Sequence, residues 1–125
     1  MISVSDEQFR QLVEDAVGAI PMRFAQHLNN VAFMIEDEPT REQLRAGGLL
    51  HGGGTLLGLY QGIPLPLRNG GYSGVLPDVI TVFKRTHEAM ASDFVSLRRD
   101  VHQTVWHEVA HYFGLDHGQI RELER

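Results

Sequence analysis

Apolar residues recur at helical spacing at the start of the chain. Ser5 stands where a helix N-cap is expected, with Gln8 three positions later to complete a capping box. The spacing predicts a helix over residues 5–18, and Pro21 suits the first turn of a second, short helix that ends near Leu28. The apolar positions of the first helix are Phe9, Leu12, Val13, Ala16 and Val17.

The longest periodic stretch lies near the other end. Ser92 can act as its N-cap, and apolar residues then repeat three and four positions apart until Gly114, a residue typical of the position just past a helix end. This predicts one long helix, after which Asp116 can cap a last short helix over residues 117–125. The periodic positions are Phe94, Leu97, Val101, Val105, Val109 and Tyr112.

Short β-prone runs lie between these helices. Residues 31–35, 56–61 and 79–84 are predicted strands, and the first is five apolar residues in a row, which favours a strand buried on both faces. Residues 41–46 can form a helical turn or two. We therefore expect one α+β domain over residues 1–125, with a small mixed β-sheet packed against N-terminal helices and a long C-terminal helix.

A long connection separates the last two predicted strands. Residues 62–78 contain three prolines and four glycines. An irregular segment of this length inside a small domain tends to have a function. We expect it to border a substrate groove.

Composition narrows the classes of partner and location. The formal charge is −5 and no Lys/Arg block is present, which argues against nucleic acid or an anionic membrane as partner. The chain has no cysteine, so any metal must be held by nitrogen and oxygen ligands. The first residues do not resemble a secretory signal and no run is long enough to span a membrane, so we expect a cytoplasmic protein.

The chemistry is concentrated in the pentapeptide His107-Glu108-Val109-Ala110-His111, an H-E-x-x-H motif inside the predicted long helix. The two histidines are one helical turn apart and about 40° apart around the axis, so both imidazoles can reach one metal ion. Glu108 lies at the edge of that face. There its carboxylate can accept a proton from a metal-bound water, which is an arrangement for hydrolysis.

The motif extends to Gly114 and His117 as H-E-x-x-H-x-x-G-x-x-H, and here the sequence resembles the metzincin zinc metallopeptidases. The resemblance implies zinc as the metal, a chain reversal at the glycine and His117 as third ligand. Metzincins also have a methionine-containing turn downstream, whereas the eight residues after His117 include no methionine.

Most of the chain resembles small bacterial proteins of a minimal zincin-like metallopeptidase family. The resemblance rests on residues 58–65 and 71–78 together with the closing helix and its tail. It implies a zincin-like fold and zinc-dependent peptide hydrolysis, with His107, His111 and His117 as metal ligands and Glu108 as general base and acid. It implies no particular peptide or protein substrate.

Alternatives remain open at several of these positions. A carboxylate or water could take the place of His117, and Glu108 could orient groups around a metal that does no chemistry. The other histidines, His27, His51, His87 and His102, are expected at the surface or at helix caps. The second hypothesis for function is a catalytically idle metal-binding module that recognises a protein partner through the same cleft. For the peptidase, a protein partner or a second copy of the chain could supply a missing wall of the cleft. Metal-assisted hydrolysis of a small non-peptide amide is the third, and nitrogen ligands also suit divalent ions other than zinc.

Overall fold

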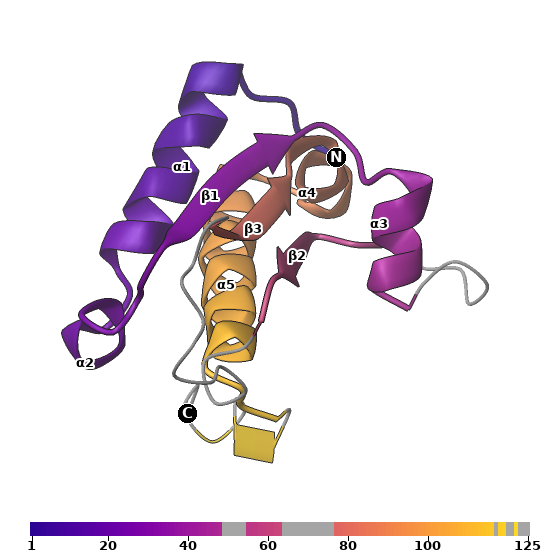
Figure 1. Ribbon diagram of the computed structural model, residues 1–125. Helices are drawn as coiled ribbons and strands as arrows, with labels where there is room; N and C mark the ends of the chain where they lie inside the picture. The colour runs from indigo at the N-terminus through magenta and orange to yellow at the C-terminus, as the bar shows by residue number, and fades with distance from the viewer. Residues whose placement is uncertain (49–54, 64–76, 117, 120–121, 123–125) are drawn as a thin grey trace.

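A three-stranded sheet packs against two long helices in this protein (Figure 1). The computed structural model describes residues 1–48, 55–63, 77–116, 118–119 and 122. Along the chain, the elements are α1 (Asp6–Gly18), α2 (Met22–Ala25), β1 (Val31–Glu36), α3 (Arg41–Ala46), β2 (Gly58–Gln61), β3 (Asp78–Phe83), α4 (Lys84–Met90) and α5 (Phe94–Tyr112). The predicted α+β class is confirmed.

The sheet has the strand order β1-β3-β2, in which β1 runs parallel to β3 and β2 runs antiparallel to it. The prediction that β1 is buried on both faces is wrong, because β1 lies at an edge of the sheet and the side chain of Met34 is 49% exposed. The strand that is buried on both faces is the central one, β3. An uninterrupted apolar run does not tell which strand has two neighbours.

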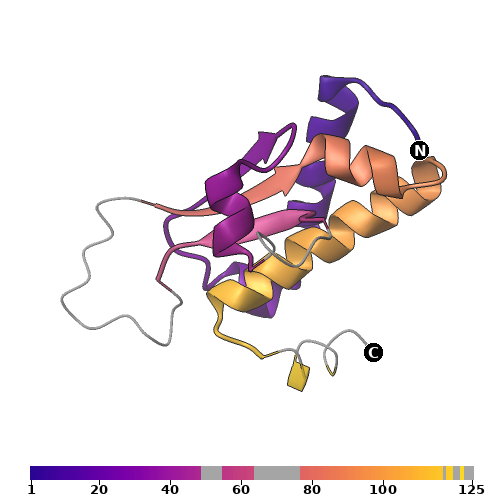
Figure 2. The same cartoon turned by 90° about the vertical axis from the view of Figure 1, so that its right-hand side faces the viewer.

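Helices α1 and α5 bury their apolar stripes against one another and against one face of the sheet, and α5 crosses beneath the strands in Figure 2. Residues four positions apart lie on one side of a helix, which is why the periodic positions of both helices meet in one core. The residues at its centre are Phe9, Leu12, Val13, Ala16, Ile80, Val82, Leu97, Val101, Val105 and Val109.

Both ends of α5 are fixed by local hydrogen bonds. Asp93, not the predicted Ser92, is the N-cap, and it forms a reciprocal capping box with Ser96. Aspartate and serine are almost equally good N-caps, so adjacent candidates cannot be separated by type. At the other end Gly114 has φ +73°, and the N–H of Leu115 bonds to the carbonyl of Ala110, as in a Schellman motif. The predicted role of Gly114 is confirmed.

One helix was not predicted. α4 follows β3 directly, and its His87 is fully buried against the ring of Phe9, with 6.0 Å between ring centroids. The expectation that His87 lies at the surface or at a cap is therefore wrong. The polar sequence of α4 lacks the apolar repeat that marks the other helices, so its buried face was not visible in the sequence.

Two predicted features lie mainly outside the described residues, namely the long connection over residues 62–78 and the last short helix. Among the described residues, Asp116, the predicted cap, and Gln119 form the reciprocal hydrogen bonds of a capping box. Within the described part of the chain, no helix is both long enough and apolar enough to cross a membrane.

Candidate metal centre

Helix α5 brings two imidazoles together at its C-terminal end. The Nε2 atoms of His107 and His111 are 3.1 Å apart, and the ring centroids are 4.8 Å apart. Two nitrogens bound at about 2.05 Å to one tetrahedral zinc ion would be about 3.3 Å apart. The two side chains are therefore already close to the spacing that a shared zinc ion requires.

Glu108 completes a group of three candidate ligands. One ligand atom from each of His107, Glu108 and His111 lies within 4.8 Å of the others. The carboxyl group is nearly buried, and its Oε1 accepts a hydrogen bond of 2.9 Å from the backbone N–H of Tyr60 in β2. This contact connects the metal-binding motif to the sheet.

Burial raises the pKa of Glu108 to about 7, and the N–H of Tyr60 acts in the opposite direction by stabilising the carboxylate. A divalent cation beside the group would lower this pKa further, because it favours the charged form. Without a bound cation, burial thus leaves Glu108 able to hold or release a proton near neutral pH.

The contact between Glu108 and β2 depends on Gly58. A Cβ atom at position 58 would lie 2.5 Å from Cγ2 of Thr104 and 3.4 Å from Cγ of Glu108. It would also lie 3.1 Å from the carbonyl oxygen of Thr81. Only glycine lets the strand approach α5 so closely. The need for a glycine here could not be predicted from the sequence, because it arises from the approach of α5.

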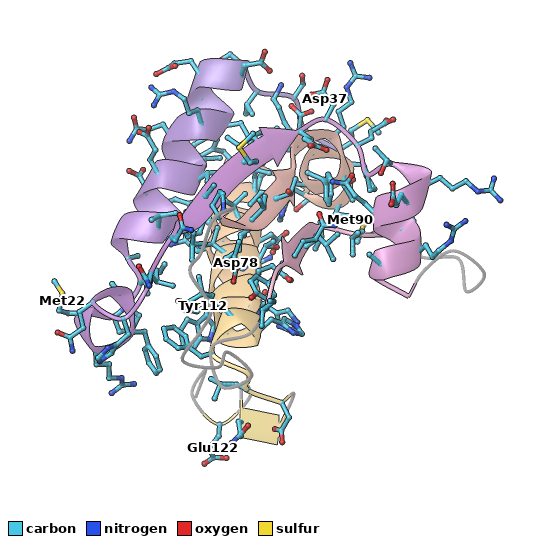
Figure 3. All side chains as sticks on the ribbon, viewed as in Figure 1. Met22, Asp37, Asp78, Met90, Tyr112 and Glu122 are labelled. Carbon is cyan, nitrogen blue, oxygen red and sulfur yellow. The ribbon has the colours of Figure 1, made fainter. Side chains whose placement is uncertain are left out.

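Tyr60 also joins the site to the start of β3. Its hydroxyl donates a 2.6 Å hydrogen bond to Oδ2 of the buried Asp78, and its ring meets the ring of Tyr112 edge to face at 6.1 Å. Figure 3 labels Asp78 and Tyr112, the two outer members of this chain of contacts. Tyr60 holds Glu108 through its backbone N–H, which every residue except proline has, so the residue type could not indicate this contact.

A cavity of about 330 Å³ opens beside His107 and Glu108. It is bordered by the segment that leads into β2 and by the outer side of α5. The lining residues are Thr55, Leu56, Leu57, Gly58, Asp100, Gln103, Thr104, His107 and Glu108. The volume is within the usual range for sites that bind small ligands or a few residues of a peptide.

The third candidate ligand and two other polar residues of α5 are not part of this group. His117 lies outside the described residues. The hydroxyl of the fully buried Tyr112 accepts a hydrogen bond of 3.1 Å from the backbone N–H of Asn29, so this side chain links α5 to the turn before β1. His102 borders a different cavity, together with Trp106, on another side of α5.

The donor set suits zinc. The two imidazole nitrogens are borderline ligands that zinc accepts readily, and the chain has no thiolate to compete with them. A catalytic zinc site needs three protein ligands and an open position. His107 and His111 would provide two of them, and the extended sequence motif predicts His117 as the third.

Comparison with known proteins agrees with this geometry. A family model for zincin-like metallopeptidases matches residues 28–125. No curated protein matches the chain. A solved structure of a conserved hypothetical protein from Thermo thermophilus is similar, with a TM-score of 0.60 and 24% identity over 88% of this chain and 94% of that one. At this identity the likeness shows the fold.

The family match spans β1 to the end of the chain and so includes the whole sheet, α5 and the H-E-x-x-H motif. Fold, motif and family model agree with one another. The chain belongs to the family of zincin-like metallopeptidases.

Proposed function

We propose that this protein hydrolyses peptide bonds in a zinc-dependent reaction. His107, His111 and His117 would hold the ion, and Glu108 would act first as base and then as acid. The observation that carries the proposal is the approach of the two Nε2 atoms to 3.1 Å with a buried carboxyl group beside them and a cavity in front.

When bound, zinc would polarise the scissile carbonyl and lower the pKa of a bound water to about 7. The rest of the proposed chemistry falls to groups of the chain. The two oxygens of Glu108 have different surroundings. Oε1 accepts a hydrogen bond from the backbone N–H of Tyr60, whereas no described residue forms a hydrogen bond with Oε2. Oε1 therefore holds the side chain in place, and Oε2 is left to take a proton from the attacking water and deliver it to the leaving amine.

Burial supports this cycle. Burial raises the pKa of Glu108 and so favours the protonated form after attack, whereas a bound cation would favour the carboxylate before attack. The hydrogen bond from the N–H of Tyr60 and the close approach of Gly58 to the side chain of Glu108 hold the carboxyl group in place. A pre-positioned base avoids the cost of ordering it during the reaction.

The substrate would enter through the cavity beside His107. Its walls come from the segment before β2 and from α5, and they combine apolar residues such as Leu56 and Leu57 with the polar Gln103 and Thr104. Such a lining suits a short stretch of peptide with a mainly small or apolar side chain next to the cleaved bond.

The first test measures zinc content and cleavage of a mixed peptide library. Wild type is compared with Glu108→Gln, which keeps the shape of the side chain but cannot accept the proton, and with His111→Ala. Matched controls are Glu42→Gln on α3 and His27→Ala, which change exposed residues away from the site. We expect about one zinc per chain and cleavage in wild type and in both controls.

The two site variants should separate binding from chemistry. Glu108→Gln should keep the metal and lose at least about 100-fold in rate, the size typical of removing general acid–base catalysis. His111→Ala should lose both metal and cleavage. Stoichiometric zinc without cleavage by wild type would favour the idle metal-binding module instead, and wild type that binds no metal would refute both functions.

A further inference from the structure

A second cavity, of about 410 Å³, lies on another side of α5, between that helix and the α1–α2 corner. None of the three grouped metal-site residues borders it, although Gln103 borders both cavities. Its described lining residues are Ala16, Ala19, Ile20, Pro21, Arg23, Phe24, Arg99, His102, Gln103 and Trp106. The volume falls in the range of sites that bind small molecules.

Aromatic side chains form one wall of this cavity. The rings of Phe24 and Trp106 meet edge to face, with 5.1 Å between their centroids. The guanidinium of Arg23 lies 5.1 Å from the centroid of Phe24, which is cation–π distance. Rigid aromatic surface of this kind offers contact area to a flat apolar group at a small cost in conformational entropy.

Cationic side chains border the same cavity. Arg23 and Arg99 both contribute to the lining, and none of the described lining residues is acidic, although the chain as a whole has a formal charge of −5. Arg99 reaches Asp100 only at 3.4 Å and its side chain is 70% exposed, so this ion pair is weak and leaves the guanidinium available. Two arginines next to an aromatic wall favour an anion, above all a carboxylate.

His102 adds a third polar group. Its Nε2 atom is buried and has no hydrogen-bond partner in the described part of the chain. Buried polar atoms usually have partners, so this atom marks the cavity wall as a place with unused hydrogen-bonding capacity. Burial is the main cause of the lowered pKa of the His102 imidazole. The charge of Arg98 also lowers this pKa, and that of Asp15 raises it.

From this combination we infer that the cavity between α1, α2 and α5 is a binding site for a carboxylate attached to an aromatic group. The aromatic group would lie against Phe24 and Trp106, and the carboxylate would be held by Arg23 and Arg99. Two sources share this chemistry, a free aromatic acid and the C-terminal carboxylate of a peptide that ends in an aromatic residue. The inference does not depend on the proposed hydrolysis.

The chain has one tryptophan, Trp106, so binding can be followed by its fluorescence. The full-length protein would be titrated with 3-phenylpropionate and with N-acetylphenylalanine, and with the amide of each. Both acids are expected to saturate the change in fluorescence, and each amide to bind at least about tenfold more weakly because it lacks the charge. The tighter of the two acids indicates the source of the natural ligand.

Variants test the assigned residues. Arg99→Gln and the double variant Arg23→Gln/Arg99→Gln should each weaken binding of the acids, the double by at least about tenfold, while Arg41→Gln on α3 should bind like wild type. Thermal unfolding checks that each variant is folded. No saturable binding by wild type, equal binding of acids and amides, or full binding by the folded double variant would each overturn the inference.

Discussion

At the scale of single residues, the candidate metal centre depends on Gly58, which has no chemistry of its own. A Cβ atom at this position would lie 2.5 Å from Cγ2 of Thr104, so only the hydrogen of glycine fits there. The strand that carries Tyr60 can therefore lie against α5, and the N–H of Tyr60 reaches Glu108. The position of the proposed base is thus set by a missing side chain on β2.

We expect Gly58→Ala to impair catalysis without loss of zinc. The new methyl group must push β2 away from α5, at a cost of about 1–3 kcal/mol in unfolding free energy. This weakens the hydrogen bond to Glu108 and should lower kcat more than it raises KM. Zinc content, steady-state kinetics and urea unfolding would measure the three effects.

The matched control is Gly18→Ala, because no heavy atom lies within 4 Å of a Cβ at position 18. It should leave kinetics unchanged and, because alanine is favoured over glycine in a helix, should raise the unfolding free energy slightly rather than lower it. Adding Thr104→Ser to Gly58→Ala removes the methyl group in the closest contact and should restore part of kcat. Wild-type kinetics in Gly58→Ala would show that the close approach of β2 does not position Glu108.

Another residue outside the metal motif should dominate the response of stability to acid. Burial lowers the pKa of His87 to about 4, against smaller upward contributions from Asp100 and the backbone of Leu57. The unfolded histidine has a pKa of about 6.5. The stability that this group contributes is therefore complete above pH 6.5 and is lost as the pH falls towards and through 4.

We expect His87→Leu to flatten the decline in stability between pH 6.5 and 4, by up to about 3 kcal/mol. The two proteins compared, one with His87 and one with His87→Leu, should both be metal-free and should both carry Glu108→Gln. The raised pKa of Glu108 would otherwise give the opposite slope, since its contribution is present below pH 4.5 and is lost as the pH rises through 7. Urea unfolding at a series of pH values measures the slope, and an unchanged slope in His87→Leu would contradict the assignment.

At the scale of elements, periodicity predicted the helices with apolar stripes and missed the one without a stripe. α1 and α5 have apolar residues at regular spacing, and both were predicted to within a residue or two of their observed ends. α4 has only a buried histidine and glutamate on its inner face, which a search for apolar repeats does not detect. Strand positions were predicted as well, but not which strand lies at the centre of the sheet, because order in a sheet is a long-range property.

The candidate site likewise has a part that could be predicted from the sequence and a part that could not. His107, Glu108 and His111 share one helix, so their spacing in the sequence fixes their arrangement in space. Tyr60 and Gly58 join them from a strand that lies far away in the chain. Local geometry could be predicted, whereas contacts that depend on how β2 meets α5 could not.

The N-cap of α5 gives a test at this scale. Asp93→Ala should lower the thermal midpoint by a few degrees, because it removes the side chain that accepts the N–H of Ser96 at the start of the helix that holds the metal motif. Ser92→Ala should have a much smaller effect. The cap lies more than three helical turns from His107, so zinc content should be unchanged in both. Equal effects of the two substitutions would mean that the capping role is not specific to Asp93.

At the scale of the whole molecule, the metal would join the end of α5 to the segment that follows it. His107 and His111 are on one helix, so an ion held by these two alone would stabilise that helix locally. A third ligand at His117 would close a loop across Gly114, where the chain already turns with φ +73°. The number of ligands should therefore be visible in how strongly zinc stabilises the folded chain.

We expect zinc to raise the thermal midpoint of wild type and His117→Ala to lose about half of that increase or more, but not all of it. At a free zinc concentration 100 times Kd, binding adds about 2.7 kcal/mol to the unfolding free energy, which corresponds to on the order of 10 °C for a chain of this size. Removing one of three ligands should weaken Kd at least about tenfold and so reduce the shift at the same zinc concentration. His111→Ala should abolish it and His27→Ala should leave it intact. A full zinc shift in His117→Ala would show that a carboxylate or water takes the third position, because the ion would then gain nothing from the imidazole at residue 117.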